Sequence, residues 1–435
     1  MPARSIALAF ALLLSALPLR AGAVQEWRQT AVASFDEVWQ TIHDTYPDPE
    51  FGGLDWEAVR RELRPRAVAA DSPEGVRVVI RQMLGRLGQS HLVLLSPGSG
   101  ARIRGDARVA VDLRLGDDGF VIVKVEPGSA AEAAGLVPGQ VVQAIDGERS
   151  AAWLESAEGA DERSRAADAY FRASAALTGP ADSPATLQVR DGTGDKTVVA
   201  GRERERGRAV RFGNLPPLVV RVQAAERATP GQRRAGVIAF NVWMPTASAE
   251  IDAAVERFRG ADGLIIDLRG NLGGLVEMMR GVAGHIIDEP VSLGLMHTRQ
   301  ADLELRVNPR RSTPDGRSVT PYGGPVAILV DEVTASASEC FAGSVQGLGR
   351  ARVFGRRTMG QALPAATRQL PSGDILMHVL GDFVTPAGVR LEGRGVVPDE
   401  IVPLAIDALR SGRDPDLDAA LAWIDREASA GGRLP

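Results

Sequence analysis

The fold of this chain is decided by Pro325-Val-Ala-Ile-Leu-Val-Asp-Glu-Val-Thr-Ala-Ser-Ala-Ser-Glu339. Its apolar run, Pro325 to Val330, predicts a buried strand, and a helical pattern follows from Glu339 to Leu348. The turn between them places Ser336 at the rim of a sheet and at the positive end of a helix, a position that favours a nucleophile and the oxyanion it creates. The spacing of Ser336 and Glu339 also suits a capping box, which only satisfies free amides. Both interpretations stay open on this stretch alone.

The composition is that of an ordinary globular protein. With 435 residues, 44% hydrophobic and 24% charged, the chain has room for roughly two to four domains. Its net charge of −5, without a long basic run, argues against nucleic acid as a partner. Only two of the 50 basic residues are lysines, Lys124 and Lys196. The one cysteine, Cys340, excludes an internal disulfide and a cysteine-rich metal site.

The first 23 residues have the pattern of a signal peptide. Arg4 is the positive n-region, residues 6–17 are the apolar h-region, and Ala21-Gly22-Ala23 is a small-residue cleavage site. No later segment approaches the length of a membrane span. We therefore expect an exported protein, periplasmic or secreted.

Four further regions follow the signal peptide. Periodic apolar residues predict helices in the first region and again in the last, whereas strands and helices alternate in the third, which favours a mainly parallel sheet. The predicted boundaries are 1–23 for the signal peptide, 24–100 for a helical domain, 101–208 for a second unit, 209–405 for an α/β core and 406–435 for a helical tail.

The second unit has the element order of a known binding module. A strand at 119–125 is followed by a short helix that ends at a glycine, a tight Pro-Gly turn and a second strand at 141–147. This order resembles a PDZ domain of the circularly permuted bacterial type. The helical stretch 150–177 is interpreted as an insertion before the closing strands.

Three more motifs of the core accompany the serine turn. Residues 266–274 read Ile-Asp-Leu-Arg-Gly-Asn-Leu-Gly-Gly and lead from a strand through paired glycines, where backbone amides can closely approach a ligand. This turn is either half of an oxyanion hole or a plain β–α connection. Residues 355–364 follow the strand after the serine helix, and residues 386–399 place Glu392 beside glycines in a Gly-Val-Val-Pro-Asp turn.

Together these motifs resemble the tail-specific, or C-terminal processing, serine peptidase family over nearly all of the mature chain. The resemblance implies a multidomain α+β fold with a helical N-terminal region, a PDZ domain and an α/β crotonase-like peptidase core. It implies that Ser336 is the nucleophile, in preference to Ser338. The oxyanion donors would then be the amide of Ala337 and that of Gly273 or Gly274.

The sequence departs from the common pattern at the base. The Ser–Lys branch of the family carries its lysine where this chain has Gln361. A second branch, similar to the tricorn core protease, uses Ser–His–Ser–Glu, and the matching positions here are Ser90, His91 and Glu392. In that scheme the neutral imidazole of His91, with a pKa near 6.5, is the general base, and Ser90 or Glu392 orients it. The alternatives to these catalytic roles are a purely structural role for the histidine and a surface ion pair between Glu392 and its flanking arginines.

The PDZ resemblance implies a peptide-binding edge at Arg108-Val109-Ala110-Val111, whose amides would hold a chain's terminal carboxylate. The alternative is a degenerate PDZ that serves only as a lid or spacer. The sequence thus predicts an exported serine endopeptidase that cuts proteins or peptides near apolar C-terminal tails, without metal or cofactor. One alternative is a catalytically inactive PDZ binding protein on the same scaffold. Another, a relative of this fold that binds apolar ligands, is disfavoured by the PDZ unit.

Overall fold

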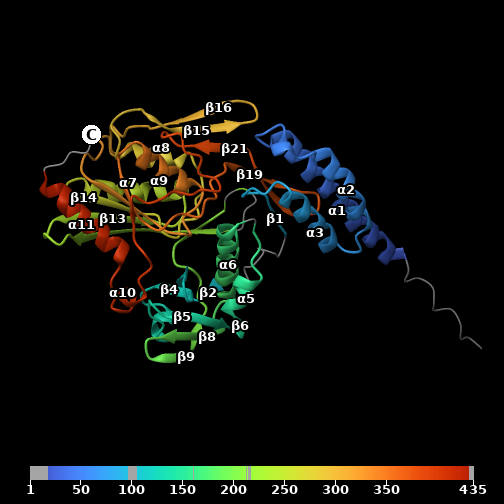
Figure 1. Cartoon of the computed structure of the whole chain (residues 1–435), viewed down its shortest axis with the longest axis horizontal. Coiled ribbons are helices and arrows are strands. Elements are labelled where there is room, and N and C mark those ends of the chain that lie inside the picture. The colour runs from blue at the N-terminus through green and yellow to red at the C-terminus, as the bar shows by residue number, and fades with distance from the viewer. Residues whose placement is uncertain (1–17, 97–104, 160, 212, 214–216, 431–435) are drawn as a thin grey trace, which may run out of the picture.

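The N-terminal end of the chain forms a three-helix bundle that projects from one end of the molecule (Figure 1). The computed structural model describes residues 18–96, 105–159, 161–211, 213 and 217–430. The bundle consists of α1 (Pro18–Thr45), α2 (Trp56–Ala69) and α3 (Pro73–Gly85). Asp55 and Ser72 cap α2 and α3 by accepting the amides of Ala58 and Gly75, as expected of such N-cap residues. Most of the expected signal peptide lies outside the described residues.

A short strand after the bundle joins it to the rest of the molecule. β1 (Val93–Leu95) pairs antiparallel with β20 (Ile375–Val379), and Leu94 lies opposite Leu376. Both leucines are buried in the hydrophobic core of the bundle. This pairing fixes the turn that contains Ser90 and His91 against the C-terminal half of the chain.

The second unit is built on a six-stranded antiparallel sheet in the order β3-β4-β5-β8-β9, with β6 paired to β5. Helix α6 packs against β3 and places Ala169, Ala173 and Ala176 in the core of the unit. The segment expected as an insertion is therefore part of this core. The elements are β2 (Ala107–Arg108), β3 (Val111–Gly116), β4 (Gly119–Val125), α4 (Ala130–Ala133), β5 (Val141–Ile145), β6 (Glu148–Arg149), α5 (Ser150–Glu155), α6 (Glu162–Ala176), β7 (Thr178–Gly179), β8 (Pro184–Asp191) and β9 (Gly194–Gly201).

The core contains a second six-stranded sheet, in the order β12-β13-β14-β17-β18-β22. All neighbouring pairs are parallel except β12 with β13, which confirms the mainly parallel sheet. Its elements and the hairpin before it are β10 (Arg208–Val210), β11 (Leu218–Val220), β12 (Val222–Ala228), β13 (Arg234–Phe240), α7 (Ser248–Phe258), β14 (Gly263–Asp267), α8 (Met278–Gly284), β17 (Val326–Val330), α9 (Ala337–Gly347), β18 (Arg352–Gly355) and β22 (Glu400–Ile401).

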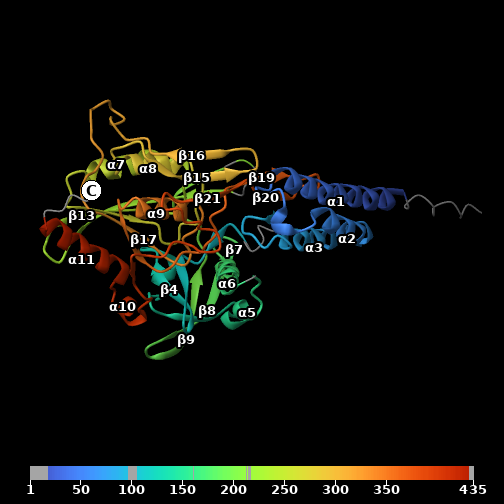
Figure 2. The same ribbon diagram turned by 45° about the horizontal axis from the view of Figure 1, so that its top comes forward.

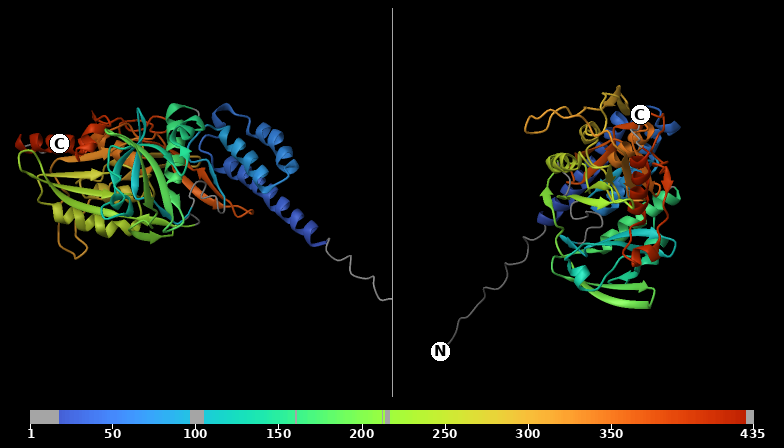
Figure 3. Two further views of the ribbon diagram at one scale, coloured as in Figure 1. Left: turned by 90° about the horizontal axis from the view of Figure 1, so that it is seen from below. Right: turned by 90° about the vertical axis from the view of Figure 1, so that its left-hand side faces the viewer.

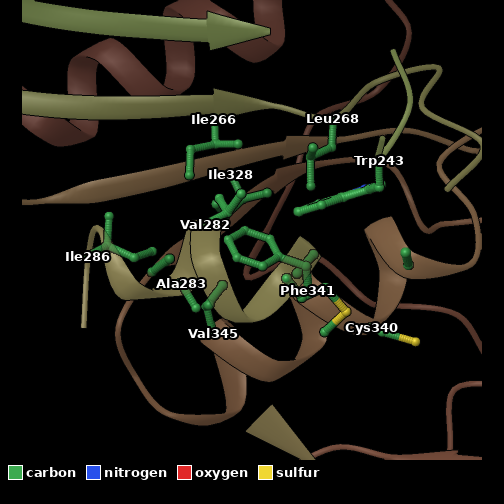
Figure 4. Close-up of a cluster of buried hydrophobic side chains, with 14 of the residues drawn as sticks. Trp243, Ile266, Leu268, Val282, Ala283, Ile286, Ile328, Cys340, Phe341 and Val345 are labelled. Carbon is green, nitrogen blue, oxygen red and sulfur yellow. The ribbon is translucent and has the colours of Figure 1, made fainter. Parts of the chain in front are cut away.

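Both faces of this sheet are covered, which explains why β17 is apolar at every position. Val326, Ile328 and Val330 face the layer formed by α7, α8 and α9, where Figure 4 shows Phe341 in the middle of the cluster. Ala327 and Leu329 face the opposite layer, formed by α11. A strand buried on both faces reads as a continuous apolar run rather than an alternating one.

The remaining elements are two small antiparallel sheets, which were not predicted from the sequence, and the helical tail, which was. Two small antiparallel sheets, β16-β15-β21 and β1-β20-β19, surround the edge of the core that faces the bundle. The tail, predicted as helical, folds back under the core sheet, at the end of the molecule opposite the bundle (Figure 3). These elements are β15 (Ser292–Thr298), β16 (Asp302–Arg306), β19 (Ala365–Gln369), β20, β21 (Gly381–Val384), α10 (Ile406–Arg410) and α11 (Pro415–Ser429). The chain thus has a mixed α/β multidomain fold.

None of the described helices is both long and apolar enough to cross a bilayer.

Candidate active site

Ser336 stands at the sharp turn between β17 and α9. Its backbone has φ 55° and ψ −124°, a region that residues with a Cβ rarely adopt. The amide of Ser336 donates to the carbonyl of Gln361 (2.8 Å) and to the carboxylate of Glu339 (3.1 Å). These two bonds hold the strained turn and leave the side chain of Ser336 half-exposed.

Ser338, the second serine of the motif, is in a different environment. It is fully buried, and its hydroxyl accepts a hydrogen bond of 2.8 Å from the indole Nε1 of Trp243, which is buried as well. A substrate carbonyl has no access to that position. The geometry therefore favours Ser336 over Ser338 as the reactive residue.

Glu339 connects the serine turn to the loop that follows β18. Its fully buried carboxylate accepts hydrogen bonds from the amides of Ser336 (3.1 Å), Gly360 (2.7 Å) and Gln361 (2.9 Å), and from the hydroxyl of Thr358 (2.5 Å). Burial raises the pKa of Glu339 from 4.5 to about 7, although all four donors favour the charged form. The sequence predicted the capping bond between Glu339 and Ser336. It did not predict the bonds from Glu339 to the loop that follows β18.

The paired glycines pass directly beside the serine turn. Gly273 has φ 100°, and a Cβ added to it would lie 2.6 Å from the Cβ of Ser336 and 3.0 Å from the amide nitrogen of Ala337. A Cβ on Gly274 would lie 2.5 Å from the carbonyl oxygen of Trp243. Only glycine allows this approach without displacement of the backbone.

The amides of this turn differ in whether they already donate a hydrogen bond within the protein. The amide of Gly273 already donates to the side chain of Asn271 (2.9 Å). The hydrogen bonds to Trp243 use the carbonyl of Gly273 and the amide of Leu275, and neither involves the amide of Gly274. Ala337 is the first residue of α9, where the amide has no partner in the helix itself. Of the two glycines, Gly274 therefore suits an oxyanion better.

The structure brings Ser90, His91 and Glu392 together in one hydrogen-bonded chain. The hydroxyl of Ser90 lies 2.7 Å from Nδ1 of His91 and donates to the carboxylate of Glu392 (3.0 Å), which also accepts the amide of Ser90 (3.0 Å). Arg390 donates to the backbone carbonyl of Glu392 and not to its side chain. Among the described residues, no arginine forms an ion pair with the Glu392 carboxylate. The surface ion pair considered from the sequence is therefore absent.

One peptide group connects this chain to the serine turn. The amide of Ala362 donates to the carboxylate of Glu392 (2.9 Å), while the carbonyl of the preceding Gln361 accepts the amide of Ser336. Residues that are far apart in the sequence thus converge on the segment 361–362.

Burial changes the charge state of the two titratable groups. It lowers the pKa of His91 from 6.5 to about 4, so the imidazole is neutral at neutral pH. The expectation of an unperturbed histidine was therefore wrong, because the sequence does not show how densely the ring is packed. Burial also raises the pKa of Glu392, against the hydrogen bonds from Ser90 and Ala362.

Neither lysine is close to this site. Lys124 is exposed on β4, with Glu126 at 3.9 Å, and Lys196 is exposed on β9, where it pairs with Asp191 at 2.6 Å. Both lysines lie on the surface of the second unit, with local acidic partners. A buried, deprotonated lysine base is thus incompatible with this structure.

A buried ion pair joins the second unit to the serine turn. Arg114 of β3 donates to the carboxylate of Asp331 (2.5 Å), and both side chains are almost fully buried. Asp331 also accepts the amides of Gly270, Val333 and Thr334, and its pKa is lowered to about 2 by the nearby arginines and these bonds. This pair was not predicted from the sequence, although an acid directly after a buried strand was a usable signal.

The predicted peptide-binding edge has few free amides. The amides of Arg108, Val109 and Val111 donate to the carbonyls of Glu203, Leu177 and Val109, respectively. Of the four residues, only Ala110 has an amide without such a bond among the described residues. Arg108, Ala110 and Val111 instead line a small cleft of mixed charge, whose other lining residues are Asp112, Lys124, Glu126, Glu203, Arg204, Glu205, Arg206 and Arg221. In the described part of the chain, no group of three or more potential ligands could hold a metal ion.

Comparison with known proteins connects this geometry to a family. Residues 234–402 match the profile of peptidase family S41, and residues 23–85 match that of the tricorn protease C1 domain. The chain is a serine peptidase whose core is similar to peptidase family S41 over these residues. The S41 match covers the serine turn, the paired glycines and Glu392, while Ser90 and His91 lie outside both matched segments.

Two relatives and one solved structure illustrate the similarity of this peptidase. Carboxyl-terminal-processing peptidase 2, chloroplastic, of Arabidopsis thaliana is 27% identical over 85% of this chain and 68% of its own length. A carboxyl-terminal-processing protease of Synechocystis is 26% identical over 88% of this chain and 84% of its own length. The photosystem II D1 C-terminal processing protease has the same fold, with a TM-score of 0.58, 23% identity and coverage of 93% of this chain and 100% of the other.

We expect Glu339→Gln to reduce kcat/KM of the peptidase at least about 100-fold, because a carboxamide nitrogen cannot accept the amides that the second carboxylate oxygen accepts. The free energy of unfolding should fall by about 1–3 kcal/mol. Peptide hydrolysis and urea denaturation would measure the two effects. Glu304→Gln, at an exposed position of β16, is the matched control, and near-normal activity of Glu339→Gln would contradict this role.

The Arg114–Asp331 pair allows a double-variant test. Arg114→Met should lower the free energy of unfolding by about 3–5 kcal/mol, because it leaves a buried carboxylate unpaired, and Arg114→Met with Asp331→Asn should recover part of that loss. Chemical denaturation would measure both variants. Arg190→Met, which removes an exposed pair with Asp195, should cost less than about 1 kcal/mol. An equal loss of free energy of unfolding in Arg114→Met and Arg190→Met would show that Arg114 does not stabilise the turn.

Proposed function

We propose that the protein is an exported serine endopeptidase that cuts proteins or peptides near their C-terminal tails through an acyl-enzyme, with Ser336 as nucleophile, His91 as base, and Ser90 and Glu392 as orienting groups. The observation that carries this proposal is the hydrogen-bonded chain from Glu392 through Ser90 to His91. The names of the similar processing peptidases support the tail specificity.

The direction of the hydrogen bonds in that chain determines the tautomer of the imidazole. Ser90 has one hydroxyl proton, which it donates to the ionised Glu392 carboxylate. Its oxygen can then only accept from Nδ1 of His91, so the ring proton lies on Nδ1. This leaves a lone pair on Nε2, which is the atom that a general base needs.

The reaction follows from these roles. The hydroxyl of Ser336 attacks the substrate carbonyl while Nε2 of His91 takes its proton and then returns it to the leaving amine. The amides of Gly274 and Ala337 stabilise the oxyanion of the tetrahedral intermediate. Hydrolysis of the acyl-enzyme uses the same base to activate water. The strained backbone of Ser336 keeps the hydroxyl at the surface of the turn.

The second unit is proposed to be a PDZ domain that captures the substrate tail. In support, its edge strand β3 lies beside α6, and α6 also contacts the serine turn through Ala167 against Val333, Ala335 and Met359. Figure 2 shows α6 at the junction of the second unit and the core. Since three amides of the predicted carboxylate loop are already bonded, the amide of Ala110 is the donor that this loop can offer to a terminal carboxylate among the described residues. The alternative, a catalytically inactive binding protein, is supported only by Gln361.

The nucleophile can be tested with a fluorophosphonate probe. The wild-type protein should react covalently with the probe and hydrolyse an unfolded protein, and Ser336→Ala should lose both activities because only the hydroxyl is removed. Mass spectrometry and a protease assay would measure the outcome. Ser338→Ala is the matched control and should still be labelled. Labelling of Ser336→Ala, or loss of labelling in Ser338→Ala alone, would show that Ser336 is not the nucleophile.

The base has a pH dependence that follows from its burial. Because the pKa of His91 is lowered to about 4, the decrease of kcat/KM that protonation of its imidazole causes should lie below about pH 5. Glu339, whose pKa is raised to about 7, can add a separate step near neutral pH, and Glu339→Gln should remove that step. A pH–rate profile of both proteins would show this, and the residual activity of Glu392→Gln should keep the limb below pH 5 if His91 titrates. A limb centred at or above pH 6.5 that Glu339→Gln retains would contradict the buried imidazole, and an active His91→Ala would exclude His91 as the base.

A further inference from the structure

Three arginines from separate segments converge at the edge of the loop that holds the nucleophile. Arg163 lies in the first turn of α6, Arg357 follows β18, and Arg394 lies two residues after Glu392. Nη1 of Arg163 and Nε of Arg357 both donate to the backbone carbonyl of Arg394, at 2.5 Å and 2.6 Å. One carbonyl oxygen, that of a third arginine, therefore gathers two guanidinium groups.

One carboxylate of the described residues faces this cluster of three guanidinium groups. Asp161 forms an ion pair with Arg163, at 3.8 Å from Nη2, which leaves the cluster with an excess of positive charge. In the same part of the chain, the side chains of Arg357 and Arg394 have no acidic partner. Burial and repulsion from Arg163 and Arg394 lower the pKa of Arg357. Exposed arginines elsewhere are commonly paired, as Arg204 is with Asp106.

The position of the cluster relates it to the active site. The guanidinium of Arg163 lies 3.2 Å from the point where a Cβ on Gly360 would stand. The amide of Gly360 donates to Glu339, and its carbonyl accepts the amide of Gly393. The arginines thus border the same short segment that fixes both Ser336 and Glu392.

We propose that Arg163, Arg357 and Arg394 form a carboxylate-binding subsite for the substrate, which makes this peptidase prefer peptides with a carboxylate close to the bond that is cut. The inference rests on the proposed function and adds a substrate class to it. The carboxylate is either an acidic side chain or the free C-terminus of the peptide.

The chemistry of the cluster suits this ligand. Guanidinium groups present planar pairs of N–H donors that match a carboxylate, and the donors of Arg394 and the terminal nitrogens of Arg357 have no acceptor among the described residues. The pre-arranged arginines repel one another, and a bound carboxylate would relieve that repulsion. Because Arg357 and Arg394 are exposed, solvent and salt screen the interaction, so we expect a preference of about tenfold rather than a strict requirement.

The test uses quenched fluorescent peptides of one sequence on the full-length protein. One series moves a single Asp through the positions around the cut site with an amidated end, and its reference carries Asn instead. A second pair has no acidic residue and differs only in a free or an amidated C-terminus. The measured quantity is the ratio of kcat/KM between each acidic peptide and its neutral partner, at low and high salt.

In the wild-type protein, at least one acidic peptide should be cut about tenfold faster than its neutral partner, and the advantage should shrink at high salt. Arg394→Gln with Arg357→Gln should bring that ratio close to one. Arg165→Gln, the matched loss of an exposed arginine on the opposite side of α6, should keep the wild-type ratio. An Asp advantage identifies a side chain as the source, and a free-acid advantage identifies the terminus. A ratio near one in every wild-type pair, or an unchanged ratio in the double variant, would overturn the proposal.

Failure of the proposed function can be distinguished from failure of this inference. If the wild-type protein hydrolyses none of the peptides, the proposed function fails, and the subsite is then tested by the fluorescence anisotropy of labelled peptides with Ser336→Ala. Tighter binding of an acidic peptide, lost in the Arg357/Arg394 double variant, would support the subsite without any hydrolysis. Equal binding of acidic and neutral peptides would exclude it.

Discussion

A single buried carboxylate, that of Glu339, is the constraint on which the rest of the site depends. It has no contact with water, and its two oxygens accept three backbone amides and one hydroxyl from the serine turn and from the loop that follows β18. A carboxylate is one of the few side chains that can accept so many donors at once. The strained backbone of Ser336 and the segment that contacts Glu392 are thereby fixed relative to each other. Pre-organisation of this kind matters because an oxyanion hole only works when its donors are already in place.

A buried carboxylate also accepts several backbone amides at two other places near the site. Asp331 gathers three amides and Arg114 at the start of the serine turn, and Glu392 gathers the amides of Ser90 and Ala362 at its far side. Each acid lies at a loop whose backbone polar groups would otherwise be buried without partners. Loops without regular secondary structure can therefore be packed in the interior. The arrangement also links the second unit to the serine turn, since β3 supplies the arginine that neutralises Asp331.

Much of this could be predicted from the sequence, because the decisive signals were local. The apolar run before Ser336, the paired glycines and the Gly-Val-Val-Pro-Asp turn each carry their own periodicity or turn chemistry. The antiparallel strands β15, β16, β19, β20 and β21 were missed because their pairing depends on distant partners, and β19 has no buried residue and no alternating pattern. The environment of His91 was missed for the same reason. Its pKa depends on residues that only tertiary packing brings around it.

The pairing of β1 with β20 also has a consequence for the order of synthesis. The imidazole lies on the N-terminal side of the second unit, whereas the serine and the acid lie far downstream, and the strand that receives β1 is made after both the serine and its helix. No N-terminal fragment that ends before Glu392 contains all the groups of the proposed tetrad. A nascent chain would therefore be inert until most of it has left the ribosome. The long separation in sequence would thus delay proteolytic activity until folding is almost complete.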